Sequence, residues 1–164
     1  MLGALIGVAF AKLSFMKDRL LLLAFTLIIP FTAHAQANPP PPELAIATKG
    51  NELAYDKTVM TAHAGQTVRV TFSNRSDPAS DFRHNWVLVK PGREEQVVTD
   101  SVQAGQSRDY VPDTPDVVAH TKLLKAGESQ SVQFQVPDTP GDYPYFCSFP
   151  GHSGLLKGVL KVSP

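Results

Sequence analysis

YPYFCSFPGHSGLLKGVLKV, residues 143–162, contains two runs of β-type sequence separated by a turn, and it carries the only cysteine of the chain. YPYFC (143–147) and GVLKV (158–162) are short apolar runs bounded by Gly and Pro, which is typical of strands. Pro150-Gly151 between them predicts a tight turn. Such a turn can bring the sulfur of Cys147, at the end of one strand, and the imidazole of His152 around a single point.

The same strand pattern recurs towards the N-terminus. TVRVTFS (67–73) and SVQFQV (131–136) alternate apolar and polar residues, and NWVLV (85–89) is a continuous apolar run, as expected for a strand buried on both faces. The segment 97–110 is polar and lacks alternation, so it predicts an excursion with a short helix. Several short strands with turn signals between them favour an all-β fold, a two-sheet β-sandwich.

The N-terminal segment has the features of a secretory signal peptide. Charged residues 17–19 precede an apolar run, 20–32, and Ala33-His34-Ala35 forms a small-x-small cleavage site. We therefore interpret residues 1–35 as a signal peptide that directs the protein to the periplasm, with Met16 as the true start. A longer signal segment and an uncleaved anchor remain alternatives.

Residues 36–42 form a stiff, proline-rich leader, and residues 43–164 have the length of one domain. From residue 36 onward the chain has twelve Lys and Arg against fourteen Asp and Glu, a net charge of −2. A nearly neutral chain without a basic run argues against nucleic acid as a partner and against a lipid surface.

A secreted chain with one cysteine cannot form an internal disulfide. Cys147 could pair with another molecule, react as a thiol, remain an inert buried side chain, or bind a metal ion. His84 opens HNWVLV (84–89) and could supply a second imidazole beside His152. Two neutral imidazoles and one thiolate in a trigonal arrangement are the ligands of a blue-copper electron-transfer site. Each residue alone has an ordinary structural explanation, and the combination favours the metal site. His63 and His120 have no such partners.

Three motifs together resemble a known family. HNWVLV (84–89), VVAHTKL (117–123) and CSFPGHSGLLKG (147–158) are similar to those of azurins, bacterial periplasmic cupredoxins, and less closely to those of the related auracyanins. The resemblance covers the chain from about residue 43 to its end. It implies a Greek-key sandwich that holds one type 1 copper ion, with His84, Cys147 and His152 as equatorial ligands.

The resemblance also assigns roles around these ligands. It implies a weak contact from the backbone carbonyl of Arg83, where the family usually has Gly. Asn85 matches an asparagine that ties the two ligand loops together, and Ser148 could supply its hydroxyl partner. Backbone amides that point at the sulfur of Cys147 would raise the reduction potential.

Two departures from the family pattern have consequences. Leu156 stands where azurins have a weak axial methionine, which predicts a three-coordinate site with a raised reduction potential. Alternatively, Leu156 is simply part of the core and another group takes the axial place. The disulfide of azurins cannot form here, so we expect the core and bound copper to supply the stability.

An apolar docking patch is expected around the exposed edge of His152, although loop packing would also explain its residues: Phe82, Phe149, Pro150, Gly151, Gly154 and Leu155. Arg83 beside the patch would favour partners with acidic surfaces. The expected partners are redox proteins such as c-type cytochromes, or copper or haem reductases and oxidases.

The function that these features favour is a soluble periplasmic electron carrier that cycles between Cu(II) and Cu(I), without enzymatic activity. Three alternatives remain at this point: a copper-delivery protein, a catalytic copper protein, and a metal-free sandwich used in adhesion. Delivery sites favour mobile or Met-rich ligands, and residues 36–164 contain one methionine, Met60. Catalysis needs an open coordination position, which Leu156 is expected to fill.

Overall fold

The computed structural model describes residues 39–164, which contain ten strands, one α-helix and one 3₁₀ turn. The expected signal peptide (1–35) lies outside the described residues. The elements in chain order are β1 (Glu43–Ala47), β2 (Val59–His63), β3 (Thr67–Ser73), β4 (Arg83–His84), β5 (Val87–Val89), α1 (Glu94–Ala104), η1 (Gln106–Arg108), β6 (Val117–His120), β7 (Leu124–Lys125), β8 (Ser129–Gln135), β9 (Gly141–Phe146) and β10 (Lys157–Ser163).

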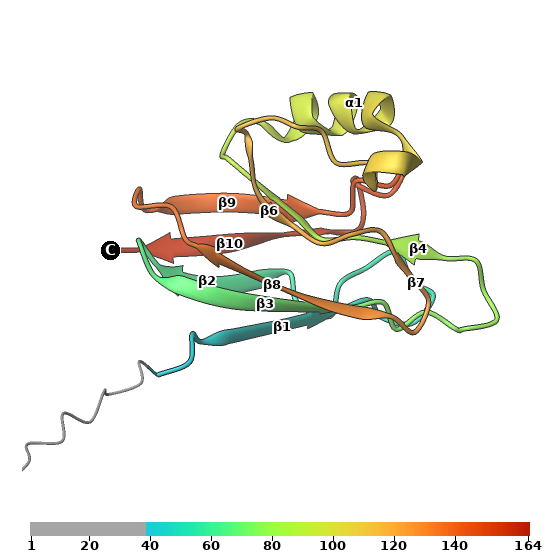
Figure 1. The fold of residues 1–164 in the computed structure, drawn as a ribbon, viewed down its shortest axis with the longest axis horizontal. Helices are drawn as coiled ribbons and strands as arrows, with labels where there is room; N and C mark the ends of the chain where they lie inside the picture. The colour runs from blue at the N-terminus through green and yellow to red at the C-terminus, as the bar shows by residue number, and fades with distance from the viewer. Residues whose placement is uncertain (1–38) are drawn as a thin grey trace, which may run out of the picture. The chain divides into compact units, whose positions relative to one another are not determined.

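The strands form two main sheets, as expected (Figure 1). One sheet has the order β1-β3-β8 and the other the order β2-β10-β9-β5-β6, while β4 and β7 make a short separate pair. The β1–β3 and β2–β10 pairs are parallel, and the other pairs are antiparallel. Many neighbours in the sheets are distant in sequence, which is the arrangement that Greek-key connections produce.

The core lies between the two sheets and follows the alternation of the strands. Val68, Val70 and Phe72 of β3 are fully buried, while their neighbours along the strand are more exposed. β3 pairs with β8 in one unbroken register along the whole strand. Trp86 and Leu160 complete this interior and are 0% exposed. The alternation in TVRVTFS therefore predicted both the strand and the face that it buries.

The apolar run that begins at His84 is not a single strand. β4 pairs with β7, β5 pairs with β6 and β9, and the residues between β4 and β5 leave the sheets. Side-chain hydroxyl groups from other segments explain the gap between β4 and β5. The Tyr55 hydroxyl donates to the carbonyl of Asn85 at 2.6 Å, and the Trp86 N–H donates to the Thr121 hydroxyl at 3.0 Å. These backbone groups consequently take no part in a strand ladder.

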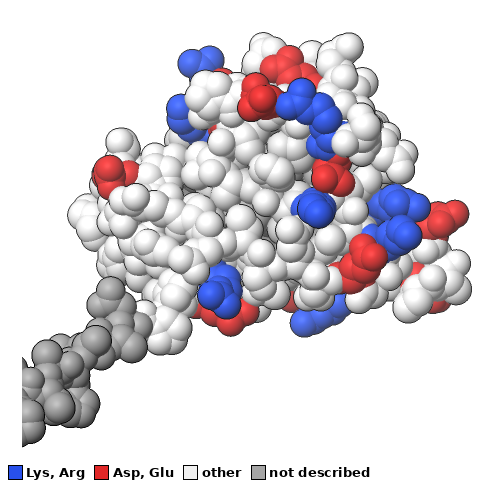
Figure 2. Space-filling view, in the orientation of Figure 1, with Lys and Arg blue, Asp and Glu red and all other residues white. Residues whose placement is uncertain are grey.

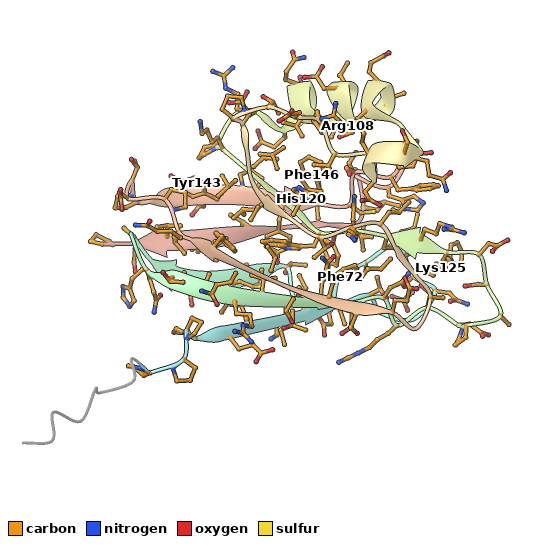
Figure 3. All side chains as sticks on the ribbon, viewed as in Figure 1. Phe72, Arg108, His120, Lys125, Tyr143 and Phe146 are labelled. Carbon is orange, nitrogen blue, oxygen red and sulfur yellow. The ribbon has the colours of Figure 1, made fainter. Side chains whose placement is uncertain are left out.

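The helical excursion begins earlier than the polar segment predicted. α1 starts three residues before Val97, with Glu94 and Glu95 in its first turn, where negative charge is favourable. Val97 packs with residues of β5 and with Phe146 in a second, smaller core. Phe146 is labelled in Figure 3. β5 is thus buried on both faces, as its continuous apolar run predicted, because α1 covers one face and the main core covers the other.

Charged side chains of both signs are mixed on the face of the described residues that Figure 2 shows. Figure 2 shows acidic and basic side chains interspersed on the visible face, without a large patch of one sign. This distribution agrees with the small net charge and gives no electrostatic footprint for nucleic acid on that face. Within residues 39–164, no helix is both long enough and apolar enough to span a lipid bilayer.

Candidate metal centre

The described residues contain one group of three or more His, Cys, Asp or Glu side chains arranged to hold a metal ion. It consists of His84, Cys147 and His152, whose ligand atoms all lie within 4.8 Å of one another. His84 comes from β4, Cys147 follows β9, and His152 lies in the turn before β10. The sulfur of Cys147 is 3.8 Å from Nδ1 of His84 and 3.7 Å from Nδ1 of His152.

These separations fit three ligands around one small ion. With the bond lengths known for zinc, about 2.3 Å to sulfur and about 2.0 Å to nitrogen, a trigonal arrangement separates sulfur and nitrogen by about 3.7 Å. A thiolate with two imidazoles is also the donor set of blue-copper sites. The residues present therefore fit a copper ion in both spacing and chemistry.

Backbone hydrogen bonds fold the loop after β9 tightly around the two ligands that it carries. The N–H of Cys147 donates to the carbonyl of Leu156 at 2.9 Å, and the N–H of Leu156 donates to the carbonyl of His152 at 2.9 Å. Gly151 has a φ of 84°, a conformation that glycine adopts without strain. The Pro-Gly turn thus brings His152 back to Cys147, as its sequence predicted.

Asn85 connects the His84 segment to this loop. Its amide Nδ2 donates to the Ser148 hydroxyl at 2.8 Å, and its Oδ1 accepts a bond from the Ser148 N–H at 2.8 Å. Nδ2 also donates to the backbone carbonyl of Asp109 at 2.8 Å. Asn85 and Ser148 are both buried, so water does not compete for these bonds.

The sulfur of Cys147 lies in an apolar environment with two backbone donors. Burial raises the pKa of the Cys147 thiol to about 11, while hydrogen bonds from the backbone N–H groups of Asn85 and Phe149 oppose this shift. Without a metal ion the group is therefore a neutral thiol at pH 7. Metal binding has to displace its proton, which couples affinity to pH.

Both imidazoles are held in the neutral form that binds metals. Burial, with a smaller contribution from His152, lowers the pKa of His84 from 6.5 to about 4. Burial also lowers the pKa of His152. Nε2 of His84 is buried and has no hydrogen-bond partner among the described residues.

The remaining predicted residues take different positions around this cluster. Leu156 is 0% exposed and belongs to the main core, and Arg83 is half-buried beside His84 in β4. Phe149 packs on the ring of His152, with 4.6 Å between ring centroids, and Phe82 stacks on His84 at 6.0 Å.

The two other histidines among residues 39–164 lie outside the cluster. His120 is exposed at the end of β6 (Figure 3), and the ring of His63 bonds to the backbone carbonyl of Pro164. Sequence reasoning did not find Tyr55, Thr121 or Asp109, which all hold the segment around Asn85. A buried hydroxyl that bonds to a distant backbone leaves no periodic signal in the sequence.

Comparison with known proteins agrees with this geometry. A family model for copper-binding proteins of the plastocyanin/azurin type matches residues 42–163. The chain belongs to this family. It is 44% identical over 121 residues to an azurin of Achromobacter denitrificans, covering 68% of this chain and 74% of the azurin. It is 39% identical over 126 residues to auracyanin-A of Chloroflexus aurantiacus, covering 75% of each chain.

Solved structures place the fold in the same family. The "blue" copper protein auracyanin A of Chloroflexus aurantiacus aligns with a TM-score of 0.69 and 38% identity over 76% of this chain and 100% of that chain. Dithionite-reduced auracyanin of Roseiflexus castenholzii aligns with a TM-score of 0.68 and 37% identity over 77% of this chain and all of that one. The cupredoxin fold expected from the motifs is confirmed. The auracyanin and azurin matches are of comparable identity.

Family membership and geometry together identify the cofactor. The chain is a cupredoxin of a blue-copper, electron-carrying family, and His84, Cys147 and His152 form its type 1 copper site. Proteins of this kind are electron carriers and not enzymes. The sequence predicted this identity, and the described structure brings together the three residues that it named.

Proposed function

We propose that this protein carries single electrons between redox proteins in the periplasm, and that its reduction potential is raised because Leu156 replaces an axial methionine. The observation that carries the proposal is the position of the Cys147 sulfur, within 3.8 Å of both imidazole nitrogens in a cluster where Cys147 and His84 are fully buried. Copper supplies a one-electron couple, Cu(II)/Cu(I), when it is bound there.

Fixed ligands suit electron transfer better than metal delivery. The Asn85–Ser148 bonds and the backbone bonds between Cys147, His152 and Leu156 hold the donors in one arrangement. Donors that do not move between oxidation states keep the reorganisation that accompanies each transfer small. A delivery site would instead need exposed or mobile ligands that release the ion to an acceptor.

Leu156 is the feature that sets this site apart from the pattern of azurins. Its backbone bonds to both Cys147 and His152, and its side chain is 0% exposed. An aliphatic side chain excludes water and offers no lone pair. A missing donor removes more stabilisation from Cu(II) than from Cu(I). Leu156 therefore favours Cu(I). The backbone carbonyl of Arg83 is the proposed weak remaining contact.

The edge of His152 is the proposed exit for the electron. The surrounding docking patch includes Leu155, which is 68% exposed, and Phe82, which is 38% exposed. Exposed apolar side chains rimmed by polar residues mark a site for brief contact with a partner. Arg83 lines the same hollow as Phe82 and His152 and would favour an acidic partner, such as a c-type cytochrome or a copper or haem oxidoreductase.

The decisive experiment adds Cu(II) to the purified protein and records its visible spectrum and voltammogram. We expect intense thiolate-to-copper charge transfer and a reversible one-electron wave in the wild type, and neither in Cys147→Ser. His120→Gln, which changes an exposed histidine outside the cluster, should retain both. A colourless wild type, or a coloured protein that yields copper readily to a weak chelator without a reversible wave, would refute an electron carrier.

A further inference from the structure

Two consecutive residues that are not glycine have left-handed backbone conformations beside the copper site. Asp109 has a φ of 54° and Tyr110 a φ of 55°, directly after the 3₁₀ turn η1. In the described part of the chain, every other residue with positive φ is a glycine. A left-handed residue with a side chain costs about 1–2 kcal/mol, so contacts with the surrounding structure have to hold these two residues in place. We refer to Asp109 and Tyr110 together as the corner.

Asp109 bonds to two segments that position the first ligand. Its carbonyl accepts the hydrogen bond from Nδ2 of Asn85 at 2.8 Å, and its carboxylate accepts a bond from the N–H of Leu123 at 3.0 Å. The Leu123 segment also contains Thr121, whose hydroxyl accepts the N–H of Trp86. The left-handed backbone at Asp109 therefore aims its carbonyl at Asn85 while its side chain holds the neighbouring loop.

Tyr110 contacts the other ligand segment. Its ring meets Phe149 edge to face, with 5.2 Å between ring centroids, and Phe149 in turn packs on His152 at 4.6 Å. Phe149 also supplies one of the two backbone N–H groups that bond to the sulfur of Cys147. The corner thus reaches the two segments that carry the ligands by two independent contacts.

The geometry points to Asp109 and Tyr110 as positioning residues that set the reduction potential by holding Asn85 and Phe149 against the Cys147 sulfur. Both Asn85 and Phe149 donate a backbone N–H to that sulfur. Such bonds withdraw electron density from the thiolate and favour the reduced ion. Loosening the corner weakens them and shifts the electron equilibrium towards Cu(II).

This inference rests on the proposed electron-carrier function, and variants matched by backbone preference test it. Asp109→Asn tolerates the left-handed conformation and keeps an oxygen acceptor for Leu123, whereas the β-branched side chain of Asp109→Val disfavours that conformation. Tyr110→Phe keeps the ring, and Tyr110→Gly removes it without backbone strain. Each copper-loaded protein is equilibrated with a redox mediator of known potential, and the charge-transfer band gives the fraction oxidised. Electron paramagnetic resonance reports the copper–thiolate geometry.

We expect Asp109→Val and Tyr110→Gly to shift the exchange equilibrium towards Cu(II) by about threefold or more, and Asp109→Asn and Tyr110→Phe to match the wild type. If the two residues have only a structural role, Asp109→Val and Tyr110→Gly will lower the melting temperature but leave the exchange equilibrium and the resonance spectrum unchanged. That result would overturn the inference. If Asp109→Val does not fold, the Tyr110 pair decides. Absence of charge transfer in the wild type would refute the proposed function, whereas a blue wild type with unchanged variants would refute only the inference.

Discussion

Asn85 and Ser148 hold each other through two hydrogen bonds of 2.8 Å, although they lie 63 positions apart in the sequence. One of them follows His84 and the other follows Cys147, so the pair fixes the distance between ligands that come from separate segments. Because both residues are buried, a lost partner would leave a polar group without water. This tie joins the two ligand segments through bonds that do not involve the ligand side chains or a metal ion.

Asn85→Leu should weaken both the metal-free fold and the copper site. It leaves the buried N–H of Ser148 unpaired, which costs about 1–3 kcal/mol, and loosens the segment beside His84. Denaturant unfolding of the metal-free protein measures the first effect, and a mediator titration, expected to show a lower potential, measures the second. The matched control is Asn74→Leu, since Asn74 is also buried and bonds to Phe82 and Leu124 but not to the loop after Cys147. Equal changes of potential in both variants would contradict the role given to Asn85.

Leu156→Met should lower the reduction potential, because a thioether near the axial position stabilises Cu(II) more than Cu(I). Voltammetry measures the change directly, and about 59 mV corresponds to a tenfold shift in a one-electron equilibrium. Leu160→Met is the control: Leu160 is equally buried in β10 and the exchange of Leu for Met nearly conserves volume. An unchanged or higher potential in Leu156→Met would mean that another group already takes the axial place.

The sequence predicted the parts of this protein that depend on local patterns. The strand at 67–73 and the ligand triad were identified because alternation, a lone cysteine and a Pro-Gly turn are visible in the order of residues. The break between His84 and Val87 was missed because it depends on hydroxyl groups of Tyr55 and Thr121 that arrive from elsewhere in the chain.

The corner that follows the helical excursion was missed for a related reason. Asp109 and Tyr110 adopt left-handed conformations that usually belong to glycine, so their identities gave no signal. The sequence also did not show where α1 begins. Only Val97 and Ser101 of the helix are buried, so its buried face is too short to mark the first turn by a periodic pattern. Tertiary contacts, which no sequence window contains, determine both features.

Leu155→Asp should slow electron exchange with a partner without changing the potential. Leu155 is 68% exposed within the proposed docking patch, and a carboxylate there would add a desolvation cost on contact and repel the expected acidic surface. Stopped-flow mixing with a c-type cytochrome measures the rate. Val102→Asp places the same charge on an apolar residue of α1 that is 55% exposed and outside the patch. If both variants slow the reaction equally, the effect is one of net charge and the patch assignment is wrong.

The metal-free protein should lose stability on acidification between about pH 6.5 and pH 4. The pKa of His84 is lowered from 6.5 to about 4 by burial and by His152, so in this range the unfolded chain binds more protons than the folded one. The stability that neutral His84 contributes to the folded state is complete above pH 6.5, the pKa of this group in the unfolded chain. It is lost as the pH falls through about 4, the pKa in the folded protein. Urea unfolding across this range should show a smaller loss in His84→Gln than in the wild type. A His84→Gln protein whose stability falls as steeply with decreasing pH as that of the wild type would refute the assignment.

Gly158→Ala should destabilise the fold, because the space above this glycine is already filled. Gly158 of β10 pairs with Tyr145 of β9, and an added Cβ would overlap the tyrosine ring and hydroxyl and would lie 2.6 Å from the carbonyl oxygen of Thr58. Neither neighbour can give way easily. Tyr145 is 0% exposed and its hydroxyl donates to the backbone of Lys57 at 2.8 Å, while the Thr58 carbonyl accepts a backbone bond from β10.

Overpacking of this kind costs about 1–3 kcal/mol, which lowers the melting temperature of a domain of this size by several degrees. Gly154→Ala is the matched control, since nothing lies within 4 Å of the position that its Cβ would take. Calorimetry of the metal-free proteins should therefore separate the two alanine variants clearly. Equal melting temperatures would show that Tyr145 can shift, and the ring that packs against Tyr55 and Trp86 would then be less firmly held than its contacts imply.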